Sequence, residues 1–280
     1  MTMRIDKLIF GIAIVMLSSC SIENNPTSEE KKSDGSNNTE FIWDFSKEKK
    51  YVYSYSQTVN AENQMSKNGS ISKSFMAGNG NVNIRVKSND LADLSLTNLE
   101  LSMVSFNDDG TPRDTTTDMM PTNVVQDMKP NGRFGEPSTD VLFDMLFPLP
   151  SYDFKEGESD KIPMKMPFNA NGSRLFSEGY NTLTFSGFKT IEGRKCAVLK
   201  GEIDISKLEI PEELDGDYKS STTGNATYYF DLKEHCYVGA DIHMIMDIMM
   251  DSETDNEDDF GMFAKMKSDN VFKIRLERIE

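Results

Sequence analysis

The chain is poor in the residue types that most enzymes use for nucleophilic and acid–base chemistry. Its 280 residues include two histidines, three cysteines and one tryptophan. The sequence holds no Gly-x-Ser-x-Gly elbow, no His-Glu-x-x-His pair and no glycine-rich phosphate loop. We therefore expect a protein that is not an enzyme and carries no cofactor, and a carboxylate-pair hydrolase is the catalytic alternative left open.

Basic residues are also in deficit. The chain has 30 Lys and Arg against 46 Asp and Glu, a formal net charge of −16 at pH 7. Nucleic-acid binding needs clustered Lys and Arg that replace counterions, so the composition argues against a nucleic-acid partner. It also argues against binding of anionic lipid headgroups by the folded part. A solvated, soluble surface explains the acidic excess.

Long apolar runs are scarce, and the clearest one lies at the amino terminus. Arg4 and Lys7 form a short basic start, and the run extends from Leu8 to Leu17. That length is about half of the roughly 20 residues that a membrane-spanning helix needs. The run is instead typical of the apolar part of a secretory signal.

The run ends in Leu-Ser-Ser-Cys at residues 17–20. This segment resembles the lipobox of bacterial lipoproteins. The resemblance implies removal of residues 1–19 as a signal peptide and acylation of Cys20 by diacylglycerol and a further fatty acid such as palmitate. The protein would then be exported and held on the outer membrane, facing the periplasm or the cell surface. An ordinary cleaved signal with an incidental Cys20 is the alternative.

Residues 20–40 contain a single large apolar side chain, Ile22, after the cysteine. Such a segment cannot bury enough surface to offset the entropy of ordering, so we expect a flexible tether. It resembles the tethers of Bacteroidetes lipoproteins, some of which direct display on the cell surface. We assign residues 41–280 to a single folded part.

Alternation of apolar and polar residues dominates this folded part. Two clear runs are 51–55, with its tyrosines on one face, and 242–250, with Ile and Met on one face. One buried and one solvated face is the pattern of an antiparallel sheet. Short hairpin connections are expected at Glu192–Arg194 and Lys233–His235.

The other elements are expected to be few. A short helix should follow Ser138-Thr139 and end before Pro148, and one helical turn is expected within 206–214. Residues 107–135 are rich in Asp, Pro, Gly, Thr and Asn, which indicates a long loop or the seam between two sheets.

We therefore predict an all-β fold with minor α: a large curved antiparallel meander sheet, as an open barrel or two packed sheets, with one or two short helices. This pattern resembles the half-barrel lipid and lipoprotein carriers of the bacterial envelope. That resemblance rests on strand pattern and expected location, which is analogy.

Several residues are candidates for a site. On the predicted strand 242–250, a ligand could lie against the pliable apolar face formed by Met244, Met246, Ile248 and Met250, although plain core packing or a copper(I) site would use the same residues. Phe41, Trp43 and Phe45 alternate as a buried first strand or as an exposed sugar-stacking surface.

Three further features are candidates for a disulfide, a calcium site and a glycosylation site. Cys196 and Cys236 could form a disulfide in an oxidising compartment, or remain two buried thiols. Asp251, Glu253 and Asp255 alternate like calcium ligands, but the bending glycine of a calcium loop is missing, which favours a solvated acidic tip. Asp114-Thr115-Thr116 resembles the O-glycosylation acceptor of Bacteroides-like bacteria, with Thr115 as the acceptor.

Two functions remain open from the sequence. The first is a membrane-anchored lipoprotein that binds an apolar ligand or a partner protein on the inner face of the sheet. The second is a structural or accessory surface lipoprotein with a filled core, which contacts its partners through loops.

The lipobox generates a direct prediction. Mass spectrometry of the chain extracted from membranes should find an amino-terminal peptide that begins at an acylated Cys20, because the signal is cut just before that residue. Recovery of an unacylated chain that retains residues 1–19, or of protein free in the cytosol, would contradict both the anchor and the expected location.

Overall fold

A computed structural model describes residues 39–134, 141–150, 155–170, 173–210, 214, 216–252 and 263–280. The described part of the chain forms eleven strands and one short helix, α2. The bounds are β1 (Lys50–Gln64), β2 (Ser72–Val86), β3 (Ala92–Phe106), β4 (Pro112–Met119), β5 (Asn123–Met128), α2 (Val141–Leu146), β6 (Ser159–Ala170), β7 (Ser173–Ile191), β8 (Arg194–Glu209), β9 (Asp217–Asp231), β10 (Cys236–Asp251) and β11 (Phe263–Ile279).

All eleven strands belong to one antiparallel sheet in the order β4-β3-β2-β1-β11-β10-β9-β8-β7-β6, with β5 also paired to β3. Strands β1 to β4 form one meander and β6 to β11 form a second. The pairing of β1 with β11 joins the two meanders, so β4 and β5 lie at one edge and β6 at the other. The predicted open, curved antiparallel sheet is confirmed, as a single sheet.

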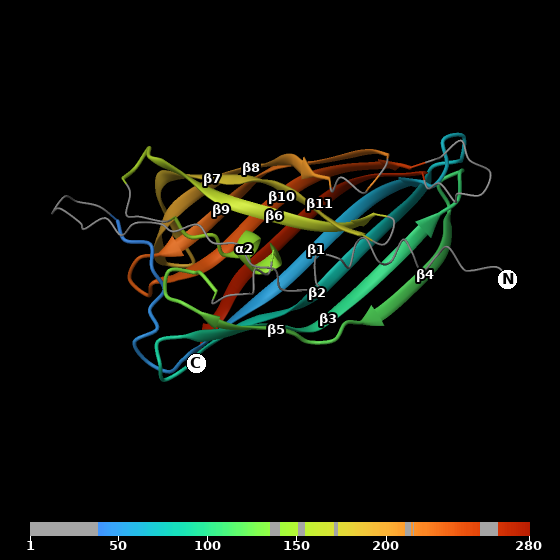
Figure 1. Ribbon diagram of the computed structural model, residues 1–280. Helices are drawn as coiled ribbons and strands as arrows, with labels where there is room; N and C mark the ends of the chain where they lie inside the picture. Colours follow the sequence, from blue (N-terminus) through green and yellow to red (C-terminus); the bar gives the residue numbers. More distant parts are fainter. Residues whose placement is uncertain are drawn as a thin grey trace.

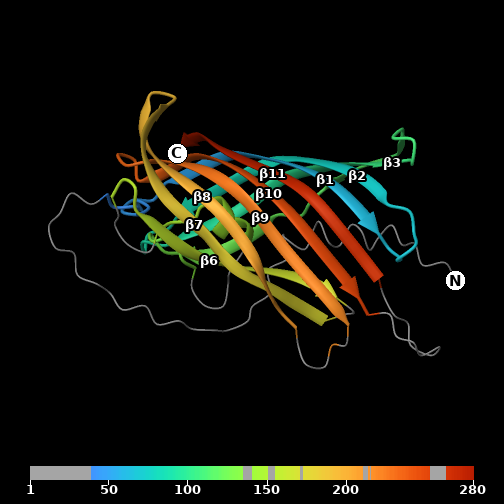
Figure 2. The same ribbon diagram turned by 90° about the horizontal axis from the view of Figure 1, so that it is seen from above.

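The sheet curls around α2, which lies on its concave side (Figure 1), and the long strands run diagonally across it (Figure 2). We call the concave side the inner face. Along β10, Ala240, Ile242 and Met244 lie on the inner face, while Asp241 and His243 lie on the outer face. The alternation in the sequence therefore decides which side chains line the inside of the curl.

Register shifts and glycines allow the strong curl. The pairings shift between Asn79 and Asn81 on β2, between Glu178 and Gly179 on β7, and between Tyr237 and Gly239 on β10. A Cβ on Gly179 would lie 2.0 Å from the backbone oxygen of Asp204 on β8. Such irregularities bend strands and increase local twist, and here the glycine lets two strands approach closely.

The hairpin predicted at residues 192–194 is confirmed, and its turn consists of two residues. Ile191 pairs with Arg194, and Glu192 and Gly193 have φ values of 49° and 80°. Positive φ at both central residues is the turn geometry whose twist matches the flanking strands. The second predicted hairpin, between β9 and β10, is also present.

The expectation of one long loop over residues 107–135 was wrong, because β4 and β5 lie within this segment and both pair with β3. The helical turn expected within 206–214 is absent over 206–209, where β8 continues as far as Glu209, while 211–213 lie outside the described residues. The predicted helix near 141–146 is present as α2, while Ser138 and Thr139 lie outside the described residues.

The close approach at Gly179 predicts a large cost for adding one methyl group. Gly179→Ala should lower the free energy of unfolding by about 3 kcal/mol, because backbone atoms of β8 would have to move. The control is Gly110→Ala, a turn position with φ of 82° and no atom near the added Cβ, which should cost about 1 kcal/mol. Equal costs in urea denaturation would show that the strand approach at Gly179 is not needed.

Candidate functional site

The inner face has two halves with different side chains. Near the end that holds the β7–β8 and β9–β10 turns, the inner residues are large, and we call this the aromatic half. Its largest buried members are Trp43, Tyr51, Tyr53, Phe143, Phe185, Tyr228, Phe230 and Tyr237. Ring centroids of Trp43 lie 5.4 Å from Tyr51 and 5.7 Å from Tyr237. These edge-on and tilted contacts are favourable arrangements for aromatic rings.

Two segments outside the sheet pack into the aromatic half. One contains Phe41, Trp43 and Phe45, which are 5%, 2% and 3% exposed. This confirms that these aromatics are buried, and the alternative of an exposed sugar-stacking surface was wrong. They lie in an extended segment that covers the sheet rather than in one of its strands. The second segment is α2 with the residues that follow it.

Buried tyrosine hydroxyls hold the α2 segment in place. Tyr228 donates to the backbone oxygen of Met145 at 3.0 Å, and Tyr237 donates to the backbone oxygen of Pro148. Tyr53 in turn donates to the backbone oxygen of Tyr237 at 2.9 Å. Burial raises the pKa of all three hydroxyls, so they remain neutral donors at any physiological pH. The aromatic half is thus a fixed core.

The other half of the inner face is lined by methionine and by short side chains, and we call it the methionine half. It also holds two rings, Phe168 and Tyr218, at its far end. Its buried residues are Val59, Asn63, Met76, Met164, Met166, Phe168, Leu175, Ser177, Asn181, Ile205, Tyr218, Ser220, Thr222, Met244, Met246, Ile248, Met250, Ala264, Ser268 and Asn270. Pairing places Gly179, Ile205, Thr222, Met246 and Ser268 in one row across five strands. Side chains in that row are shorter than the rings of the aromatic half.

The four residues predicted as an apolar ligand face all lie in the methionine half. Met244, Met246, Ile248 and Met250 occupy the inner face of β10 and are 1–8% exposed. Thioether side chains adapt to irregular neighbours because they have three rotatable bonds. Whether a ligand contacts these residues stays a prediction.

Polar groups of the methionine half are neutral. Its buried polar side chains are Asn63, Ser177, Asn181, Ser220, Thr222, Ser268 and Asn270, and the one buried carboxylate of the described residues, Asp231, lies at the opposite end of the sheet. A buried charge requires a paired charge, so this half offers no partner for an ionised group. It can offer hydrogen bonds to a neutral one.

Two of these polar atoms have no hydrogen-bond partner in the structure: the Oγ of Ser177 and the Oδ1 of Asn181. Both residues are on the inner face of β7 and are at most 1% exposed. Sequence reasoning missed them. The signal was present, because Leu175, Leu183 and Phe185 set an apolar alternation in which positions 177 and 181 are polar. Buried polar groups usually have partners, so these two exceptions mark a place where a ligand could bind.

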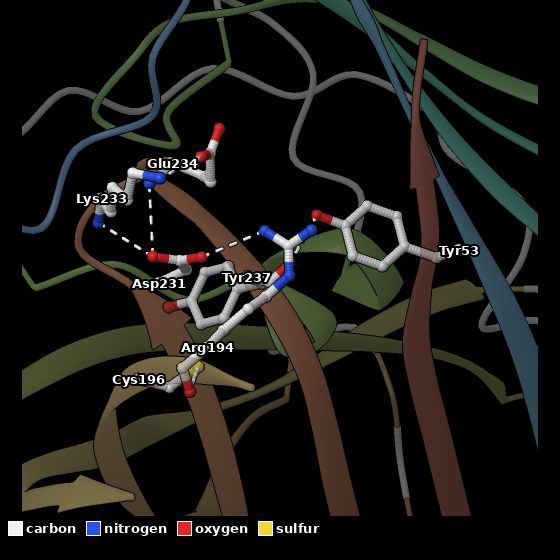
Figure 3. A network of polar contacts seen from close by, with 7 residues as sticks. All are labelled: Tyr53, Arg194, Cys196, Asp231, Lys233, Glu234 and Tyr237. Atoms are coloured by element: carbon white, nitrogen blue, oxygen red, sulfur yellow. Dashed lines mark hydrogen bonds and ion pairs between the residues drawn. The ribbon is translucent and has the colours of Figure 1, made fainter. Parts of the chain in front are cut away.

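At the end of the sheet that holds the β7–β8 and β9–β10 turns, Asp231 organises the β9–β10 turn (Figure 3). Its Oδ1 accepts from the backbone amides of Lys233 at 2.9 Å and Glu234 at 3.3 Å, and its Oδ2 accepts from Arg194 at 3.1 Å. The hydrogen bond that Arg194 donates to Asp231 raises the pKa of the guanidinium further. Every partner belongs to a hairpin, so the network is structural.

The candidate disulfide is absent. Cys196 and Cys236 are free and fully buried, and each is paired in the sheet with Asp231 from opposite sides. The whole width of β9 therefore separates them. Two strand spacings amount to about 9.5 Å, which exceeds the roughly 7 Å that a disulfide can bridge between Cα atoms. The alternative of two buried thiols is correct.

The remaining sequence candidates are placed as follows. Asp251 ends β10 and pairs with Lys67 at 3.0 Å, while Glu253 and Asp255 lie outside the described residues, as does Cys20. Thr115 lies on the exposed edge strand β4, opposite Val104 of β3, so its glycosylation stays a prediction.

The described residues gather no group of three His, Cys, Asp or Glu side chains that could hold a metal ion. His243 is on the outer face, and its Nε2 lies 2.8 Å from Asp269 Oδ1. His235 lies in the β9–β10 turn. Within the described ranges, no helix has the length and apolarity to cross a membrane.

Comparison with known proteins finds likenesses among solved structures. No family model matches the chain, and no curated protein matches it. Among solved structures, the chain is similar to lipovitellin, in a structure described as showing lipid–protein interactions in lipovitellin. The identity is 12% and the TM-score is 0.42, and the match covers 83% of this chain and 25% of that one. The chain thus spans a quarter of the lipovitellin chain.

The buried thiols generate a prediction about reactivity. Burial raises the pKa of Cys196 to about 11 and that of Cys236 to about 12. Thiolate is the reactive form, so at pH 8 iodoacetamide should leave both peptides unlabelled in the native protein and should label both after denaturation. Labelling should become appreciable only as the pH approaches 11. Rapid labelling of native protein at pH 8, or a mass increase on reduction, would contradict this placement.

Proposed function

We propose that the protein binds an apolar, chain-shaped ligand, such as a lipid acyl chain, along the methionine half of the inner face. The observation that carries this proposal is the contrast between the two halves. Large rings and the α2 segment fill the aromatic half, whereas glycine, serine, threonine and methionine line most of the other, with the rings of Phe168 and Tyr218 at its far end. Short side chains leave the strand backbones close to the interior, and methionines can repack around a guest.

The dimensions and chemistry of the methionine half support this proposal. The eight residues from Met244 to Asp251 span about 27 Å. An acyl chain fills one leaflet, which is about 15 Å of the bilayer's hydrocarbon core. Each methylene that leaves water contributes about 0.8 kcal/mol. A chain lying along these residues would therefore bind through many small apolar contacts, without any ionic contact.

The proposal includes a location. Export and acylation at Cys20, as the lipobox resemblance implies, would hold the folded part beside the outer membrane, on its periplasmic or outer surface. A tether of about twenty flexible residues spans roughly 25 Å on average. The folded part would then remain within reach of the lipids that we propose as its source of ligand.

A second candidate is a structural surface lipoprotein with a filled interior. The observation that favours it is the low exposure of inner side chains in both halves, which form one continuous hydrophobic cluster. The two functions differ in what a large side chain would meet in the methionine half. In a filled core it would clash, whereas in a binding site it would replace the ligand.

Thr222 and Thr223 provide a matched test, because they are adjacent on β9 and face opposite sides. Thr222 is buried on the inner face, and Thr223 is exposed on the outer face. In membranes that contain the full chain, a diazirine-bearing fatty alcohol, which is uncharged, should crosslink to the protein upon irradiation. We expect Thr222→Phe to lower this labelling at least fivefold and Thr223→Phe to leave it unchanged.

Thermal unfolding of the same two variants distinguishes the candidates. Under the binding proposal, Thr222→Phe should keep a cooperative transition near that of Thr223→Phe, because the ring occupies the ligand's place. Overpacking of a filled core costs about 1–3 kcal/mol. A variant that is strongly destabilised, in a protein that takes up no fatty-alcohol label, would favour the structural role.

A further inference from the structure

Asn181 lies where the two halves of the inner face meet, and its orientation is fixed by its neighbours. Its Nδ2 donates to the hydroxyl of Tyr228 at 3.1 Å. That hydroxyl in turn donates its one hydrogen to the backbone oxygen of Met145. The reversed amide would place Oδ1 beside a hydroxyl with no proton left to donate. The Oδ1 atom is therefore held away from Tyr228, as an acceptor without a donor.

The oxygen of Asn181 packs over a glycine of the neighbouring strand. A Cβ on Gly201, in the neighbouring strand β8, would lie 2.6 Å from Asn181 Oδ1. Gly179 is the next inner residue of β7, so the surface between Asn181 and Ser177 carries no side chain. Four residues of strand separate the two polar positions by about 13 Å. The strip from Asn181 to Ser177 is thus bare backbone with an unpartnered oxygen at each end.

The character of the two oxygens selects the ligand's polar group. An amide oxygen can only accept a hydrogen bond, whereas a serine hydroxyl can donate or accept. The buried side chains of the methionine half include no ionised group. A carboxylate or phosphate here would lack a cationic partner. Its oxygens are acceptors, so they could not form a hydrogen bond with the Oδ1 of Asn181.

We propose that Asn181 accepts a hydrogen bond from a hydroxyl of an uncharged lipid, such as a fatty alcohol or a monoacylglycerol, whose apolar chain extends past Ser177 into the methionine half. This assignment rests on the proposed function and adds the class and orientation of the ligand. A site built to accept a hydrogen bond discriminates strongly against an analogue that lacks the donor, because its buried acceptor then stays unpaired.

The test uses a pair of photoactivatable probes on membranes that contain the full chain. Both carry the same diazirine-bearing alkyl chain; one ends in a hydroxyl and the other in its methyl ether, which cannot donate. We expect the alcohol to label peptides of β9, β10 and β11 at least tenfold more efficiently than the ether. Excess unlabelled fatty alcohol should compete.

The variant Asn181→Leu keeps a side chain of similar size but removes the acceptor. It should reduce the alcohol-to-ether ratio to about one while labelling of the same strands persists. The control is Asn225→Leu on the outer face of β9, where the side chain is exposed, and it should keep the wild-type ratio. If Asn181→Leu does not fold, the ratio measured on the wild-type protein still decides the question.

The outcomes separate the two proposals. Equal labelling by alcohol and ether in the wild-type protein, confined to the methionine half, would overturn the role of Asn181 and leave apolar binding intact. No competable labelling by either probe would overturn the proposed function itself. A wild-type preference that Asn181→Leu retains would show that another group receives the hydroxyl.

Discussion

One constraint governs this structure: a single sheet of eleven strands has an apolar face that must leave water, and the described residues form no second sheet to pack against it. The sheet therefore curls, and the curl depends on the places where the strand ladder is irregular. Glycines stand beside the register shifts on β2, β7 and β10. At Gly179 the neighbouring backbone approaches so closely that no side chain fits. Curvature is thus encoded locally and turns one face of the sheet into an interior.

The interior has two parts, and they differ in the segments and side chains that fill them. The α2 segment and the residues around Trp43 pack against tyrosine and phenylalanine rings at one end, where Tyr228 and Tyr237 bind their backbone oxygens. Towards the other end the rings give way to methionine, serine and threonine. Tyr228 stands at the boundary, because its hydroxyl contacts both α2 and Asn181. The fixed core therefore positions the polar group that we assign to ligand recognition.

Much of the fold could be predicted from period-two alternation and turn residues, because both are local properties. The inner residues of β10 and the turn at Glu192-Gly193 are examples. Strand β4 was missed because it is short, exposed along its whole length and rich in Thr and Asp. Strand β5 was missed because it has six residues, and its two buried residues, Val125 and Met128, do not follow the alternation of a half-buried strand. The partners of Asn181 lie 47 and 20 positions away in β9 and β8, and local pattern carries no information about such distances. The same holds for the cysteines, Cys196 and Cys236, which are separated by β9 in the sheet.

The central claim, that the methionine half holds an apolar ligand, is tested most directly by the lipid that accompanies the protein. Organic extraction of the full chain, isolated from membranes, releases non-covalent lipid and leaves any covalent anchor attached. The account predicts a stoichiometric amount of extracted lipid that Thr222→Phe removes. Extracts of wild type and Thr222→Phe with the same trace content would contradict it.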